Sequence, residues 1–359
     1  MAGSDVQQPL PEGGRTSALS RRFYFENRVR KLYFNSMWTL LVLVGLIAIF
    51  TIREGEKFFD PVNFRNIALD VSQLMLLAVG MTFVIITAGI DLSVSSVLVF
   101  SAIVGAKVMS NLAGTPEQVR QYEFPNESIA IPIGLALAVI CGLGWGLING
   151  MIITKMKLPP FLVTLGTLSA SLGFARIISK GASVTYVPIN VQAWIGAKRV
   201  FDFLPILVIV TSVVVVWAFV VLTFTRFGRY TFAIGSNAAA ARRAGIDVDR
   251  HLIKVYALSG TLAGLAGAMD IARFINPGVA THSTDNLRAV SAVVIGGTSL
   301  FGGMGSIIGT VIGTFIPAVL SNGLVIGGIQ PFWQDVLIGV ILIIAVYIDQ
   351  RRRRADERM

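Results

Sequence analysis

One acidic side chain, Asp91, lies inside an apolar stretch that is long enough to cross a membrane. No other charged residue occurs over positions 74–106. A charge at membrane depth costs roughly 2.5–3.5 kcal/mol on insertion scales, so such a side chain faces a protein interior or a water-filled path. Gly89 precedes Asp91 and a serine cluster begins at Ser93, a pattern typical of a helix that breaks and restarts. We therefore expect Asp91 and Ser93 to line a path through the membrane, to cap a restarting helix, or to do both.

The composition of the chain predicts a polytopic, all-α membrane protein. Of its 359 residues 54% are hydrophobic and only 14% are charged, whereas soluble domains carry about 25% charged residues. The single cysteine, Cys141, excludes a disulfide framework within one chain, and the two histidines have no partners at metal-ligand spacing. No soluble segment is long enough for an enzyme domain, and no catalytic constellation is visible. The sequence therefore predicts neither an enzyme nor a bound metal.

A window of about 20 residues, the length that spans a bilayer, predicts ten transmembrane segments. The predicted spans are 36–52, 67–88, 91–109, 129–152, 161–179, 203–224, 253–273, 287–300, 305–321 and 333–349. The segment 287–300 is short and ends in glycines, so it is expected to form a re-entrant pair with the next span.

The distribution of basic residues predicts that both ends of the chain are cytoplasmic. With ten spans, the segments on the side of the N-terminus carry 19 of the 30 Lys and Arg residues, and the loops on the other side carry 7. Cytoplasmic segments are enriched in Lys and Arg. The chain is thus expected to divide into a basic, partly disordered tail (1–35), a transmembrane region (36–349) and a short basic tail (350–359).

One cytoplasmic segment, 225–254, contains the pattern of a short helix. Ser236 or Asn237 can cap its start, and the alanines that follow, Ala239 and Ala240 among them, favour a helix. Basic residues suit its last turn, and a glycine suits its end; these are Arg242, Arg243 and Gly245. Two turns are not stable alone in water, so the helix must dock on something. A contact for another protein and an inert connector on the bilayer surface both fit.

A glycine-rich segment at 296–306 has no lysine in the register of a phosphate-binding loop. We expect it to form a re-entrant turn or a tight helix crossing, which either packs the bundle or lines a path. No Walker A pattern occurs in the chain, so any ATP-driven function requires ATP and Mg²⁺ to be bound by another polypeptide.

Four charged residues flank the predicted outer loop 274–286: Asp270, Arg273, Asp285 and Arg288. They could be ion pairs at the ends of spans, which contribute little energy. They could also guide the approach of an external protein.

A few further residues are candidates for the wall of a path. Asn149 precedes a glycine within an apolar segment, and the aromatic residues Phe83 and Phe301 could stack on a solute in the path. Ordinary packing within the bundle explains most aromatic residues of this kind equally well.

Several segments together resemble the permease subunits of ABC importers for sugars, in the ribose-type branch of a family that also includes branched-chain amino acid permeases. They are GMTFVIITAGIDLSV (80–94), LINGMIITK (147–155) with LPPF (158–161) and VTLGT (163–167), IGSNAAAARRAGI (234–246), VVIGGTSLFGGMGSIIG (293–309) and PFWQ (331–334). Ser95 departs from the pattern, because this branch commonly has glycine there.

The resemblance implies a division of labour among several subunits. Such permeases pair with a second permease, often an identical one, in the bacterial inner membrane. Each presents a cytoplasmic coupling helix to an ATP-binding cassette ATPase, and the 236–245 segment matches that position. A periplasmic or lipid-anchored binding protein delivers the solute, here expected to be a pentose, hexose or polyol. The alternative is a proton- or ion-coupled carrier in which Asp91 titrates, and the scarcity of other intramembrane charges argues against it.

Overall fold

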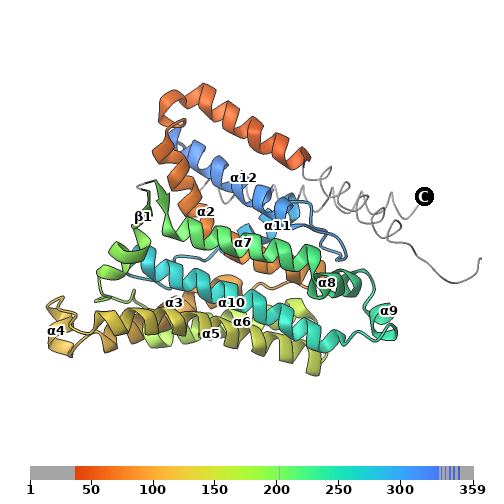
Figure 1. The fold of residues 1–359 in the computed structure, drawn as a ribbon, viewed down its shortest axis with the longest axis horizontal. Coiled ribbons are helices and arrows are strands. Elements are labelled where there is room, and N and C mark those ends of the chain that lie inside the picture. The colour runs from red at the N-terminus through yellow and green to blue at the C-terminus, as the bar shows by residue number, and fades with distance from the viewer. Residues whose placement is uncertain are drawn as a thin grey trace, which may run out of the picture.

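The protein is a bundle of helices (Figure 1). The computed structural model describes residues 37–201 and 203–330, and six positions of the last predicted span (333, 336, 339, 340, 343 and 347), all of them helical. The predicted tails 1–35 and 350–359 lie outside the described residues. Most of the predicted span 333–349 and of the 331–334 motif does so as well.

The described elements follow one another along the chain as apolar helices separated by short connections. They are the first helix Met37–Lys57 ending in the 3-10 turn η1 (Gly55–Lys57), α2 (Pro61–Ile86), α3 (Val94–Leu112), α4 (Pro116–Arg120), α5 (Glu127–Lys155), α6 (Pro160–Ser179), the π-helical turn η2 (Gln192–Gly196), β1 (Arg199–Val200) paired antiparallel with β2 (Leu204–Pro205), α7 (Ile206–Phe224), α8 (Arg226–Ser236), α9 (Ala238–Arg243), α10 (Val248–Phe274), α11 (Asp285–Ile295) and α12 (Ile307–Ile326).

Eight of these helices are long and apolar enough to cross a membrane: the first helix, α2, α3, α5, α6, α7, α10 and α12. They confirm the predicted all-α polytopic fold and coincide with eight of the ten predicted spans. Their edges differ from the predictions by a few residues. The third span begins at Val94 rather than at Asp91, because Asp91 lies in the break between α2 and α3.

The segment predicted as the span 287–300 is a short helix followed by an irregular loop. Helix α11 ends at Ile295, and its 11 residues reach only about 16 Å at 1.5 Å per residue. The glycine-rich loop 296–306 continues from it and leads into α12. The segment is therefore interrupted, as its glycines predicted, and it is not a full span; its re-entrant course through the membrane stays a prediction. Irregular backbone within a membrane is tolerated only where protein or a water-filled cavity surrounds it.

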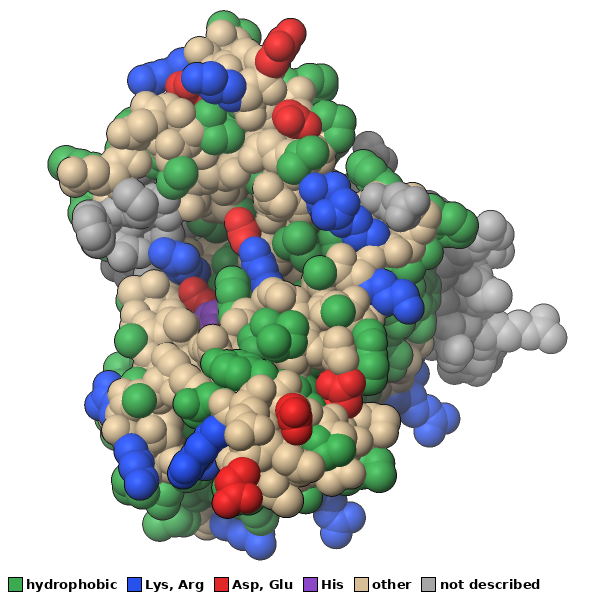
Figure 2. Space-filling view, turned by 90° about the vertical axis from the view of Figure 1, so that its left-hand side faces the viewer, with side chains coloured by type: hydrophobic (Ala, Val, Ile, Leu, Met, Phe, Trp, Pro, Cys, Tyr) green, Lys and Arg blue, Asp and Glu red, His purple; other side chains and the backbone are tan. Residues whose placement is uncertain are grey.

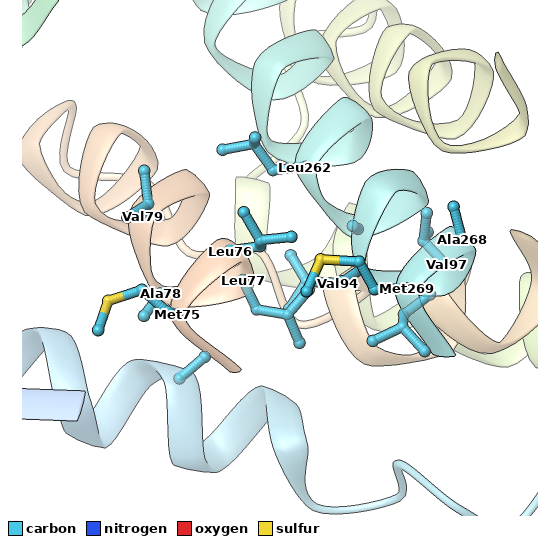
Figure 3. Packing of buried hydrophobic residues seen from close by; sticks show 14 of the residues in the cluster. Met75, Leu76, Leu77, Ala78, Val79, Val94, Val97, Leu262, Ala268 and Met269 are labelled. Carbon is cyan, nitrogen blue, oxygen red and sulfur yellow. The ribbon is translucent and has the colours of Figure 1, made fainter. Parts of the chain in front are cut away.

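Helix α10 is packed on both sides by other spans. Figure 3 shows Leu76 and Leu77 of α2 near Leu262 and Met269 of α10, with Val94 of α3 close by. On another side α10 crosses α5 at close range. A Cβ atom on Gly142 would overlap the backbone of Gly260 and Gly264. Small residues allow such close helix contacts in membranes.

The two ends of the bundle differ. Helix α4 and the β1–β2 hairpin lie at one end, and α8 and α9 lie at the other (Figure 1). We call these the hairpin end and the α9 end.

Candidate functional site

The carboxylate of Asp91 is buried and holds the break between α2 and α3 together. It is 1% exposed. Its Oδ1 accepts hydrogen bonds from the backbone N–H of Ser93 at 3.0 Å and from the Ser93 hydroxyl at 2.6 Å, and its Oδ2 accepts from the Ser259 hydroxyl of α10 at 2.9 Å. The contact with the Ser93 N–H satisfies a free donor at the start of α3, where Ser93 itself makes no side-chain cap. Asp91 therefore holds the start of α3 from two residues before the N-cap position, which Ser93 occupies, and not from the N-cap or first turn itself.

The Asp91 cap belongs to a larger buried polar network. The Asn149 side chain of α5 donates to the Ser93 hydroxyl at 2.9 Å. The Ser171 hydroxyl of α6 donates to that of Ser96 at 2.8 Å, and Ser96 in turn donates to the Ser93 carbonyl at 2.8 Å. Four helices thus meet through hydroxyl and amide groups that are each at most 4% exposed.

Neighbouring elements also hold the backbone of the break. The Thr164 hydroxyl lies 3.1 Å from the Ile90 carbonyl, and the Asn286 amide donates to the Leu92 carbonyl at 3.3 Å. The Tyr256 side chain packs closely on Gly89, so that an added Cβ there would lie only 2.5 Å from the Tyr256 hydroxyl. Among the described residues, the Tyr256 hydroxyl and Asn149 Oδ1 are buried polar atoms with no hydrogen-bond partner in the structure.

The two aromatic candidates lie in different surroundings. Phe83 is fully buried on α2 and packs on Phe227 with ring centroids 5.9 Å apart. Phe301 is 42% exposed in the loop 296–306. The structure does not bring Phe83, Phe301 and Asp91 to a common surface, and the role of each in a path stays a prediction.

The four charged candidates around the loop after α10 belong to two separate groups of interacting side chains. His282 bridges Asp270 and Asp285, with its Nε2 2.9 Å from Asp270 Oδ1 and its Nδ1 2.6 Å from Asp285 Oδ2. Arg288 lies 3.9 Å from Asp285. Arg273 forms an ion pair with Asp70 of α2.

The His282 bridge requires a protonated imidazole, because ionised carboxylates only accept hydrogen bonds and both ring nitrogens face one. Burial alone would lower the pKa of His282, but the hydrogen bonds and charges of Asp270 and Asp285 together raise it to about 10. Asp270 itself is only 2% exposed. A protein that binds this face would therefore contact the residues around Asp270 and not Asp270 itself. Figure 2 shows a histidine among acidic and basic side chains in a hollow of the face at the hairpin end.

The predicted cytoplasmic helix exists as α9 and carries the caps that its sequence indicates. Asn237 Oδ1 accepts a hydrogen bond from the Ala240 N–H at 2.9 Å. After the helix, Gly245 adopts a φ of +83° and donates to the Arg242 carbonyl at 3.0 Å, a glycine C-cap. Ala241 is buried against Ile234 and Val248, and this small apolar cluster anchors the helix.

The face of α9 away from that anchor is open. All seven predicted contact residues are exposed: Ser236, Asn237, Ala239, Ala240, Arg242, Arg243 and Gly245. Arg242 is also paired with Asp249 at the start of α10. In chemical terms, the segment is a short, capped, basic helix that projects from the α9 end of a membrane bundle.

The sequence did not reveal the distant partners of Asp91 and Arg273. Ser259 lies 168 positions from Asp91, and Asp70 lies 203 positions from Arg273, so no local pattern joins them. His282 had a usable signal, because it precedes Asp285 by three residues. Within the described residues, no group of three or more His, Cys, Asp or Glu side chains could hold a metal ion.

Comparison with known proteins defines the class of the chain. Residues 63–346 match the family model described as branched-chain amino acid transport system / permease component. A fructose import permease protein of Rhizobium meliloti is 37% identical over 328 residues, which cover 88% of this chain and 85% of the relative. A ribose import permease protein of Bacillus subtilis is 34% identical over 336 residues, covering 92% and 96%.

A third relative, a D-allose transport system permease protein of Escherichia coli, is 34% identical over 319 residues, covering 89% of this chain and 93% of the relative. No solved structure matches the chain.

The fold and the matched relatives define a multi-pass inner-membrane permease, a transport component rather than an enzyme. The chain belongs to the branched-chain amino acid transport system / permease component family, and its relatives named above are two sugar import permeases and one sugar transport system permease. The resemblance seen in the sequence is confirmed. The comparisons give no support to the ion- or proton-coupled carrier.

Proposed function

We propose that this chain is the membrane-spanning subunit of an ATP-driven ABC importer for a sugar or sugar-like solute. It performs no covalent chemistry. A separate ATPase subunit binds ATP and Mg²⁺, an external binding protein delivers the solute, and a second permease copy completes the path. In this arrangement both termini and α9 are cytoplasmic, and the hairpin end is external.

The observation that carries this proposal is the exposed face of α9. The helix has only 6 residues and is too short to persist alone in water, yet caps at both ends and a buried Ala241 hold it in place. Its outward face bears Arg242 and Arg243. A rigid basic helix on the side rich in Lys and Arg suits a cytoplasmic partner, and we assign that partner as the ATPase.

The relatives support this solute class, because two are named for the import of fructose and ribose and one for the transport of D-allose. These are neutral polyhydroxyl compounds, and pentoses, hexoses and polyols all fit this chemistry. A path that releases its solute must bind it weakly, so high affinity belongs to the external binding protein.

The positions of the remaining candidate residues support the roles that we propose for them. Asp91, Ser93 and Asn149 form a polar centre inside the bundle that can face the path when the helices move apart, and Phe83 and Phe301 are further candidates for its wall. On the external face, Arg273, Asp285 and Arg288 are the candidates for contact with the binding protein, with Asp270 holding His282 behind them.

Purification of the chain from its native membrane in a mild detergent tests this proposal. Mass spectrometry of the purified complex should find an ATP-binding cassette ATPase in stoichiometric amount, and a complex with two copies of this chain would establish a homodimer. Recovery of the chain alone, under conditions that keep known ABC complexes intact, would contradict the proposal.

A further inference from the structure

Three segments that are far apart in the sequence meet at backbone contact near α9. They are the end of α8 at Gly235, the end of α2 at Ile86, and the loop 296–306 at Gly303. The Gly303 N–H donates a hydrogen bond to the Ile86 carbonyl at 2.8 Å. A Cβ on Gly235 would overlap that same carbonyl oxygen and lie 2.7 Å from the Gly303 nitrogen. No side chain other than hydrogen fits at Gly235 without a shift of backbone.

Gly302 extends this contact to the break that precedes Asp91. A Cβ on Gly302 would lie 2.8 Å from the Ala88 Cβ and 2.9 Å from the Gly235 carbonyl oxygen. Gly302 and Gly303 both have positive φ, +83° and +76°, which only glycine adopts without strain. We call Gly235, Gly302 and Gly303 the glycine junction.

The glycine junction lies between two features described above, helix α9 and the break that precedes α3. On one side Gly235 is followed by Ser236 and by Asn237, the cap of α9. On the other side Ala88 has a φ of +61°, a left-handed conformation uncommon for a residue with a side chain. Ala88 is three residues before Asp91, whose carboxylate caps α3.

We propose that the glycine junction is the mechanical link that carries the displacement of α9 to the break at Ala88 and to the loop 296–306. The inference rests on the proposed function, in which an ATPase binds α9. Backbone in direct contact has no flexible side chain to absorb a shift, and close-packed interfaces move between discrete arrangements rather than deforming smoothly. The three glycines are thus positioning residues for transport.

The substitution Gly235→Ala tests the link, with Gly166→Ala as the matched control. Gly166 lies on α6 with no atom within 4 Å of an added Cβ, so the same methyl group meets open space there. Both variants are purified with their ATPase and reconstituted with the loaded binding protein. We expect Gly235→Ala to assemble and hydrolyse ATP, while transport per ATP falls roughly tenfold, within the range typical of coupling between sites. Gly166→Ala should match the unmodified protein.

The two proposals fail in different ways. If the ATPase is absent from the purified complex, the proposed function itself is wrong. If Gly235→Ala assembles and transports with unchanged yield per ATP, only the link through the glycine junction is wrong.

A distance measurement keeps the test decisive if Gly235→Ala does not fold. In a Cys141→Ser background, spin labels are placed at Arg229→Cys on α8, Met304→Cys in the loop 296–306, and Phe161→Cys on α6, all at exposed positions. A rigid link predicts that the 229–304 distance stays constant when ATP binds, while the 229–161 distance changes. A 229–304 distance that changes as much as the 229–161 distance would overturn the proposal.

Discussion

Individual polar side chains, buried or largely buried, hold this bundle together at the places where its helices break or end. Asp91 receives three hydrogen bonds, two from Ser93 and one from Ser259. His282 joins Asp270 and Asp285 across the loop between α10 and α11. A buried group of this kind stabilises the fold only while its partners are present, because a buried donor or acceptor left unpaired costs about 1–3 kcal/mol.

Removal of the Asp91 carboxylate should destabilise the protein. Asp91→Ala leaves the Ser93 N–H and two hydroxyl groups without their acceptor, so we expect a loss of about 1–3 kcal/mol or more. Asp91→Asn keeps one carbonyl oxygen and should cost less. Thermal unfolding in detergent measures both. Asp249→Ala is the control, since its ion pair is about half exposed and such pairs contribute about 0–1 kcal/mol. Equal stability of Asp91→Ala and the control would contradict the capping role.

The His282 bridge predicts a dependence of stability on pH. The pKa of His282 is raised from 6.5 to about 10 in the folded protein, so the folded state binds the proton more tightly than the unfolded state. This contribution is complete below pH 6.5, declines as the pH rises, and is lost above about pH 10. The melting temperature should therefore fall more steeply between pH 7 and pH 10 in the unmodified protein than in His282→Asn. Identical slopes would show that His282 is not protonated in the bridge.

At the scale of elements, the sequence predicts the membrane spans and the capped helix α9, because both depend on local features of the chain. Apolar length predicts the spans because a helix must cross a fixed thickness, and the Asn237 and Gly245 caps predict α9. Gly89 and Asp91 correctly locate the break. The sequence could not show which distant residues complete these features. Ser259 reaches Asp91, and Gly303 reaches Ile86, only because of the packing of α10 and the path of the loop 296–306.

Changes on α9 should separate ATP hydrolysis from transport. Gly245→Pro is incompatible with the positive φ of that position and removes the N–H that donates to Arg242. Arg243→Glu reverses a charge on the exposed face. For both we expect normal membrane insertion and a loss of ATP-driven uptake, measured together in reconstituted complexes.

Arg250→Glu is the control for this pair. Arg250 is also exposed at the α9 end, with 83% of its side chain accessible, but it lies on α10. If Arg243→Glu and Gly245→Pro both transport as well as this control, α9 is not the contact with the ATPase.

At the scale of the whole molecule, the spans differ in how much of their surface other helices cover. Helices α2 and α3 are largely buried, whereas the first helix, α5, α6 and α7 leave most of their surface open. Large apolar side chains such as Trp38, Phe174 and Trp217 are exposed on them. In a membrane these surfaces face lipid or, in the arrangement proposed above, a second permease copy.

Uptake into proteoliposomes is the most direct measurement of the central claim. The vesicles contain this chain with its co-purified ATPase, and radiolabelled ribose, fructose and allose are supplied with the binding protein. An ATP-driven importer requires ATP at the α9 side and is insensitive to a protonophore. Uptake that persists without ATP and collapses when a protonophore is added would instead show a gradient-driven carrier.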